Sequence, residues 1–182
     1  MPPEHSIASV ESMVAGFIDA ANRFDDAARR RDRIRTYTAL VEALNWAVMV
    51  DDRARVDWRP DGEPLGWNWR ERMRKAGAEG IQVLGGLRLA RNRVHHQWAD
   101  ALAMTERWYA YKRPLMVPHW TWRPVEELPP PDPKHPDHPE SVATYCELLA
   151  GRQVRPTLDV LCGAFYALQR ELEPDSARGH PV

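Results

Sequence analysis

Apolar residues recur every three or four positions along most of the chain, which is the spacing of one face of an α-helix. The spacing predicts a first helix capped by Ser6 or Ser9 and ending near Arg31, and a second helix ending near Trp58. Their expected core positions are Val10, Val14, Phe17, Ile18, Ala21 and Phe24 in the first helix, and Ile34, Tyr37, Leu40, Val41, Leu44 and Val48 in the second. Because the link between them is short, we expect an antiparallel helical hairpin.

Prolines and glycines interrupt the pattern over residues 59–78 and leave one short helical piece, at about 69–76. A third long helix is predicted over about 79–111. It contains two adjacent glycines, Gly85 and Gly86, each of which costs a helix about 1 kcal/mol relative to alanine. Two explanations are open: the glycines permit a close helix crossing, or the helix begins just after them.

Residues 112–138 are rich in proline and tryptophan and have no apolar period, so they are predicted to form an irregular excursion that covers a groove or docks a partner. The pair His135 and His138 lies within it. No cysteine or carboxylate motif completes a tetrahedral ligand set around these histidines, so no metal site is predicted. The last residues, 174–182, are expected to be a flexible tail.

Two further helices are predicted after the excursion. One covers about 140–150 and is opened by an Asp137-x-x-Glu140 cap, and the other covers about 156–173. The whole chain, 1–182, is thus expected to be a single all-α domain, a four- to five-helix bundle with a proline-rich irregular insertion.

The charge of the chain is nearly balanced, with 25 lysines and arginines against 26 aspartates and glutamates. This balance excludes a globally basic nucleic-acid binder. Arginines nevertheless concentrate over 23–35 and 70–93. Each run is either a solvated helix face or a local basic surface.

The two cysteines, Cys146 and Cys162, both lie in helical apolar patterns, so neither a disulfide framework nor a cysteine metal site is expected. The first residues lack the charged and then apolar run of a secretory signal, and no apolar stretch approaches the length of a membrane span. These features favour a soluble cytoplasmic protein without a membrane partner.

One short motif carries the candidate chemistry: Arg91-Asn92 followed by His96 within the third predicted helix. Arginine followed five residues later by histidine is expected about once by chance, but the added asparagine lowers that expectation to about 0.02. Asn92 and His96 are one helical turn apart and face the same way, whereas Arg91 lies at the margin of the apolar stripe. Arg91 is therefore either bonded to an acidic residue or directed into a polar cleft between two subunits.

The segment Arg91–His96, on a helix of an all-α chain, resembles the Arg-polar-x-x-x-His signature of HEPN-domain proteins. The resemblance implies a homodimer in which two copies of the motif meet across the interface. It also implies a metal-independent endoribonuclease that needs no cofactor, acting as a toxin or antiphage effector, with an antitoxin or another protein partner left open. The alternative is a non-catalytic HEPN-like dimer that binds RNA or protein.

In the ribonuclease hypothesis, Arg91 places positive charge on the phosphate and His96 transfers protons. Asn92 orients the imidazole or a phosphate oxygen. His95 is a second candidate for proton transfer, because Arg88 precedes it at a spacing that the family tolerates.

Expected RNA contacts come from arginines near the motif and from a tryptophan that stacks on bases. These residues are Arg88, Arg93, Arg70, Arg74 and Trp69. The opposing interpretation is that the tryptophan caps the helical core, because tryptophan is usually buried.

Overall fold

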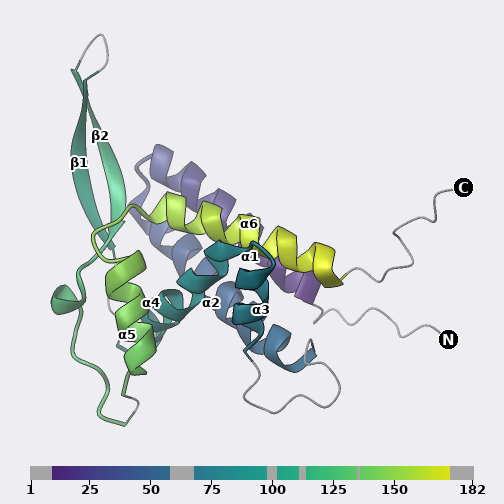
Figure 1. Cartoon of the computed structure of the whole chain (residues 1–182). Coiled ribbons are helices and arrows are strands. Elements are labelled where there is room, and N and C mark those ends of the chain that lie inside the picture. Colours follow the sequence, from purple (N-terminus) through teal and green to yellow (C-terminus); the bar gives the residue numbers. More distant parts are fainter. Residues whose placement is uncertain (1–9, 58–67, 98–101, 111–113, 135, 173–182) are drawn as a thin grey trace, which may run out of the picture.

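The computed structural model describes residues 10–57, 68–97, 102–110, 114–134 and 136–172, with side chains undescribed at 56–57, 95–97, 103–110, 114–118 and 171–172. Within this part the fold is predominantly helical, with one two-stranded antiparallel hairpin (Figure 1). The elements are α1 (Val10–Arg29), α2 (Arg33–Asp57), α3 (Trp69–Lys75), the 3-10 helix η1 (Glu79–Gln82), α4 (Val83–Gln97), β1 (Leu102–Ala110), β2 (Pro114–Trp122), the 3-10 helix η2 (Val125–Glu127), α5 (Pro139–Leu148) and α6 (Val154–Leu172). None of the described helices is long and apolar enough to cross a membrane.

The helices α1 and α2 form the predicted antiparallel hairpin. Gly16 near the start of α1 lies against Trp46, while Arg23 further along α1 binds Glu42 earlier in α2. A later residue of α1 thus contacts an earlier residue of α2, which confirms the antiparallel arrangement. The core is closed by α6, where the rings of Phe17 and Phe165 meet edge to face with centroids 5.0 Å apart.

One predicted core position of α2 is wrong. Ile34 is 80% exposed. The predicted core positions Leu40, Leu44 and Val48 are buried, and the buried face of α2 also includes Thr36, Ala39, Ala43 and Ala47. Ile34 points away from this face, because it lies about 180–200° around the helix from Thr36 and Ala43.

The third predicted helix ends far earlier than expected. It ends at Gln97, and residues 102–110 form β1, which pairs with β2 from Leu102 opposite Trp122 to Ala110 opposite Pro114. The predicted helix through residue 111 and the wholly irregular excursion over 112–138 are therefore both wrong. Apolar residues of β1 recur at helical spacing, so only pairing with the second strand reveals the hairpin. Prolines are tolerated in β2 because each strand of a two-stranded sheet has one edge without a partner strand.

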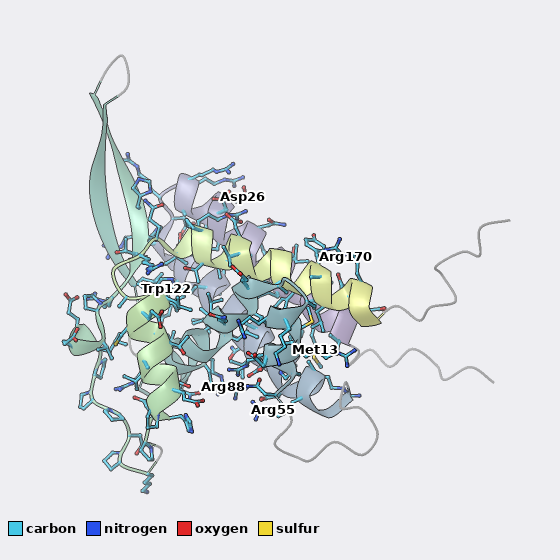
Figure 2. All side chains as sticks on the ribbon, viewed as in Figure 1. Met13, Asp26, Arg55, Arg88, Trp122 and Arg170 are labelled. Atoms are coloured by element: carbon cyan, nitrogen blue, oxygen red, sulfur yellow. The ribbon has the colours of Figure 1, made fainter. Side chains whose placement is uncertain are left out.

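The hairpin projects from the helical body and is anchored at its base by Trp122 (Figures 1 and 2). This indole is fully buried, and its Nε1 donates to the hydroxyl of Thr157 in α6 at 3.2 Å. The backbone of Trp122 also accepts from Gly151 and donates to Arg152, each at 2.9 Å. These contacts fix the base of the hairpin to the link between α5 and α6.

The adjacent glycines of α4 mark a close helix crossing. Both are buried inside α4, which begins before them, so the alternative of a helix start after them is wrong. A Cβ at Gly86 would lie 2.8 Å from Leu149 Cδ1 and 3.0 Å from Tyr145 Cα, and a Cβ at Gly85 would lie 3.1 Å from Thr144 Oγ1. Because these two positions carry no side chain, the backbone of α4 lies directly against α5.

Gly86→Ala is expected to lower the free energy of unfolding by about 1–2 kcal/mol, because overpacking against the backbone of α5 outweighs the gain in helix propensity. Gly163→Ala in α6 is the matched control, since a Cβ there meets nothing within 4 Å. This control is expected to raise the free energy of unfolding by up to about 1 kcal/mol. Urea unfolding of both variants checks the prediction, and a stabilised Gly86→Ala protein would contradict the close crossing.

Candidate functional site

The side chain of Arg91 is half-buried between α4 and α2 and is held by two amides. Its Nε donates to Oδ1 of Asn45 in α2 at 3.2 Å, and one of its terminal nitrogens donates to Oδ1 of Asn92 at 3.4 Å. Both partners are neutral. Within the described part of the chain, the guanidinium is thus positioned by hydrogen bonds without a carboxylate to compensate its charge.

Two other arginines around the motif bind a buried carboxylate. Asp51 in α2 is 1% exposed and accepts from Nε of Arg70 at 2.7 Å. Terminal nitrogens of Arg70 and Arg88 also donate to it, and Arg88 reaches Asp52 at 2.5 Å as well. Arg55 lies 4.0 Å from Asp51, and Figure 2 shows Arg55 and Arg88 near one another on the helical body. This cluster of Asp51, Arg70 and Arg88 ties α2 to α3 and α4.

Trp69 belongs to the same cluster rather than to the surface. Its side chain is 1% exposed, and its Nε1 donates to Oδ1 of Asp51 at 3.1 Å. A ring in this position cannot stack on a base without leaving the core. Trp69 thus takes a structural role in the core, whereas RNA contacts by Arg70 and Arg88, whose side chains are 24% and 28% exposed, stay a prediction.

The side chain of Arg93 is also buried. It is 5% exposed, forms an ion pair with Asp137 and donates to the backbone oxygen of Pro129. The sequence predicts Asp137 as the cap of α5, and this prediction is wrong. The N-cap is His138, which makes no capping hydrogen bond through its side chain. Arg93 joins α4 to the segment that precedes α5 and is not available as an RNA contact.

Arg74 is the one expected RNA contact that lies on the surface. It is exposed and binds Glu71, one turn earlier in α3, with nitrogen and oxygen 2.6 Å apart. An exposed pair of this kind contributes little to stability and competes weakly with a phosphate.

The structure describes the side chains of only part of the motif. Asn92 is half-buried and directs its Oδ1 to Arg91, so the structure brings these two residues together. His95 and His96 belong to α4, but their side chains lie outside the described residues. Proton transfer by either imidazole stays a prediction.

Sequence inspection missed Asn45 and Asp51. Both come from α2, far along the chain from α4. For Asp51 a signal existed: it continues the helical stripe of Leu44, Ala47 and Ala54, where a carboxylate must find a buried partner. For Asn45 no comparable signal existed, because an asparagine at the edge of a stripe is ordinary.

A hollow of about 880 Å³ lies between η1, the start of α6 and the base of the hairpin. Gln82, Arg152, Gln153 and Thr157 supply polar groups to its lining. None of the residues expected at the functional site lines it. Among the described residues, no three histidine, cysteine, aspartate or glutamate side chains gather where they could hold a metal ion.

Comparison with known proteins adds no relative: no protein-family model, curated protein or solved structure matches this chain significantly. Function must therefore be inferred from the residues and their contacts. The resemblance of the segment Arg91–His96 to HEPN domains stays a prediction from the motif.

Proposed function

We propose that this chain is a metal-independent endoribonuclease of the HEPN type, folded as a helical bundle and active as a homodimer. The observation that supports the proposal is the state of Arg91. Arg88 and Arg93, its neighbours on α4, are paired with carboxylates, whereas Arg91 is held by Asn45 and Asn92. A half-buried guanidinium without an acidic partner among the described residues is suited to receive an anionic ligand such as a phosphodiester.

The proposed reaction uses the 2'-hydroxyl of RNA as nucleophile. A histidine removes the hydroxyl proton as the 2'-oxygen attacks phosphorus, and a second histidine gives a proton to the 5'-oxygen as the P–O5' bond breaks. The products are a 2',3'-cyclic phosphate and a free 5'-hydroxyl. Arg91 stabilises the charge that accumulates on the crowded phosphate, and Asn45 and Asn92 hold Arg91 in place for it.

Two subunits complete the proposed site. Each motif provides one His96, whose ordinary pKa lies near neutral pH and suits both halves of the proton transfer. One chain supplies half of the acid and base pair, so we propose that the two copies of α4 face each other across a two-fold axis. Such an enzyme fits a toxin or antiphage effector, restrained by an antitoxin or another protein partner.

Incubation of the purified protein with mixed cellular RNA in EDTA tests the proposal. We expect cleavage that persists in EDTA, leaves cyclic phosphate ends and falls by about 10²–10⁴-fold in His96→Ala. His138→Ala is the matched control, because that histidine lies exposed at the start of α5 and is expected to leave cleavage unchanged. A folded dimer that cuts no RNA would instead indicate a non-catalytic module that binds RNA or protein.

A further inference from the structure

The turn between α1 and α2 carries the densest run of arginines in the described chain. Residues 29–35 contain five arginines and one aspartate. Arg29 is paired with Asp25 at 2.5 Å, and Arg35 with Asp32 at 3.4 Å. The remaining arginines of the run, Arg30, Arg31 and Arg33, are all exposed, and we call them, together with the exposed Ile34, the turn patch.

The three arginines of the turn patch make no ion pair with any described residue. Arg29 and Arg35 beside them occupy Asp25 and Asp32, and Asp26, one turn before Arg30, makes no ion pair with the turn patch. The five arginines of the run outnumber these three carboxylates, so the turn carries an excess of positive charge although the chain as a whole is nearly neutral. Such a local excess of charge attracts a polyanion.

The backbone of the turn has a fixed shape. Asp32 accepts a hydrogen bond from the backbone N–H of Arg35 at 3.0 Å and so caps the start of α2. The N–H of Arg31 donates to Ala28 O, and that of Asp32 to Ala27 O, each at 3.0 Å. Arg31 itself has φ of +58°, a left-handed conformation that is unfavourable for a residue with a side chain. The backbone that carries the three arginines is thus held by hydrogen bonds, so a ligand has to order the side chains but not the turn itself.

One residue of the turn patch, Ile34, lies on the same side of α2 as Asn45, the partner of Arg91. Ile34 and Asn45 are eleven residues apart in α2, which is close to three full turns, so both lie on one side of the helix about 16 Å apart. The exposed Thr38 and the half-buried Val41 lie between them on the same side. Asn45 in turn binds Arg91. A chain crossing the turn patch can follow this side of α2 to Arg91.

We propose that the turn patch binds the phosphate backbone of single-stranded RNA and leads the strand along α2 to Arg91. The choice of RNA as the polyanion rests on the proposed ribonuclease function. Guanidinium groups suit this role because they stay charged and present several N–H donors to phosphate oxygens. A small anion in the hollow of about 400 Å³ beside the turn fits less well, because Asp26 and Asp32 also line that hollow.

An anionic membrane surface is the competing partner for a basic turn. Interfacial binding to a membrane requires a broad apolar face as well as positive charge. Ile34 is the one large apolar side chain of the described turn that is exposed, and its neighbours on both sides are charged. The chemistry of the turn patch therefore favours a phosphate backbone over a bilayer.

Fluorescence anisotropy with a labelled 2'-O-methyl RNA oligonucleotide tests the inference. This probe lacks the 2'-hydroxyl nucleophile, so binding is measured without cleavage. In the variant Arg30→Gln/Arg31→Gln/Arg33→Gln, the slope of log K against log salt is expected to fall by about 2, and affinity near 0.1 M salt by about 10- to 100-fold. The melting temperature is expected to stay unchanged, because the three side chains make no ion pair in the described structure.

The matched control is Arg72→Gln/Arg152→Gln/Arg170→Gln, which removes the same charge from exposed positions outside the turn. Retention of affinity and slope in this control supports the inference. An equal loss in both variants would overturn it, because only net charge would then matter. Unchanged RNA binding combined with lost binding to phosphatidylserine vesicles would also overturn it, in favour of a membrane.

The same variants separate this inference from the proposed function. If the protein binds 2'-O-methyl RNA through the turn patch but leaves unmodified RNA intact, the result contradicts the nuclease and supports the binding surface. If cleavage depends on His96 while the triple variant leaves both cleavage and affinity for the probe unchanged, the result supports the nuclease and overturns the binding surface.

Discussion

Asp51→Asn is expected to lower the free energy of unfolding by about 3 kcal/mol, the lower end of the range for removing one partner of a buried ion pair. The carboxylate is 1% exposed and accepts hydrogen bonds from Trp69, Arg70 and Arg88. Its loss leaves two guanidinium groups, on side chains 24% and 28% exposed, without their shared counter-charge. The residual exposure of these arginines is the reason for choosing the lower end. Urea unfolding followed by circular dichroism gives the measurement.

Asp52→Asn is the matched control. Asp52 is the next residue, has the same chemistry and binds the same Arg88, but its side chain is 59% exposed. Exposed pairs contribute about 0–1 kcal/mol, so this substitution is expected to be nearly neutral. Equal effects of the two substitutions would contradict the structural role assigned to the buried cluster.

The effect of Asp51→Asn is also expected to depend on pH. Burial by itself raises the pKa of the Asp51 carboxyl, but hydrogen bonds from Arg70 and Arg88 and their charges outweigh it and hold the pKa below its usual value. Because the folded pKa is lower than the unfolded one, the ionised carboxylate stabilises the fold fully above about pH 5 and progressively less as the pH falls through the folded pKa. The difference between wild type and Asp51→Asn should therefore stay constant from about pH 7 to about pH 5 and shrink as the pH falls further.

Arg91→Gln is expected to reduce RNA cleavage by about 10²–10³-fold, the usual effect of removing one donor that stabilises charge in a transition state. Glutamine keeps a polar side chain that can still bond to Asn45 or Asn92 but carries no charge. If Arg91 acts on the transition state, kcat falls while KM changes little. Steady-state cleavage of a defined RNA over a range of RNA concentrations provides both constants.

Asn45 offers a second measurement of the same site. In Asn45→Ala, Arg91 keeps its charge but loses the acceptor that holds its Nε. We expect a smaller fall in kcat than for Arg91→Gln, because misplacement weakens the contact with the phosphate without removing it. Arg170→Gln, an exposed arginine of α6, is the control for loss of charge. Unchanged cleavage in Arg91→Gln would remove Arg91 from the mechanism.

Local spacing predicts the helices well where one face is buried along its whole length. The extents of α1, α2 and α3 agree with the predictions to within a few residues, and α6 begins two residues before the expected Pro156. The prediction fails after Gln97, because the apolar residues of β1 recur at a spacing that a helix also satisfies. A strand is specified by its pairing partner, and the partner here is another segment of nine residues that contains prolines. Pairing of this kind cannot be read from one window of sequence.

The sequence by itself determined the helical character of the chain, the turn at residues 30–32 and the adjacency of Arg91 and Asn92, because each depends on near neighbours. Only the tertiary structure decided which arginine charges are compensated. Asp51 lies 37 residues from Arg88, Asp137 lies 44 residues from Arg93, and Asn45 lies 46 residues from Arg91. All three arginines occupy one helix within six positions and look alike in sequence. Arg88 and Arg91 meet residues of α2, and Arg93 meets the segment before α5. Two of the three arginines thereby gain a carboxylate partner and Arg91 gains an amide, because the packing of distant segments sets the partner of each side chain.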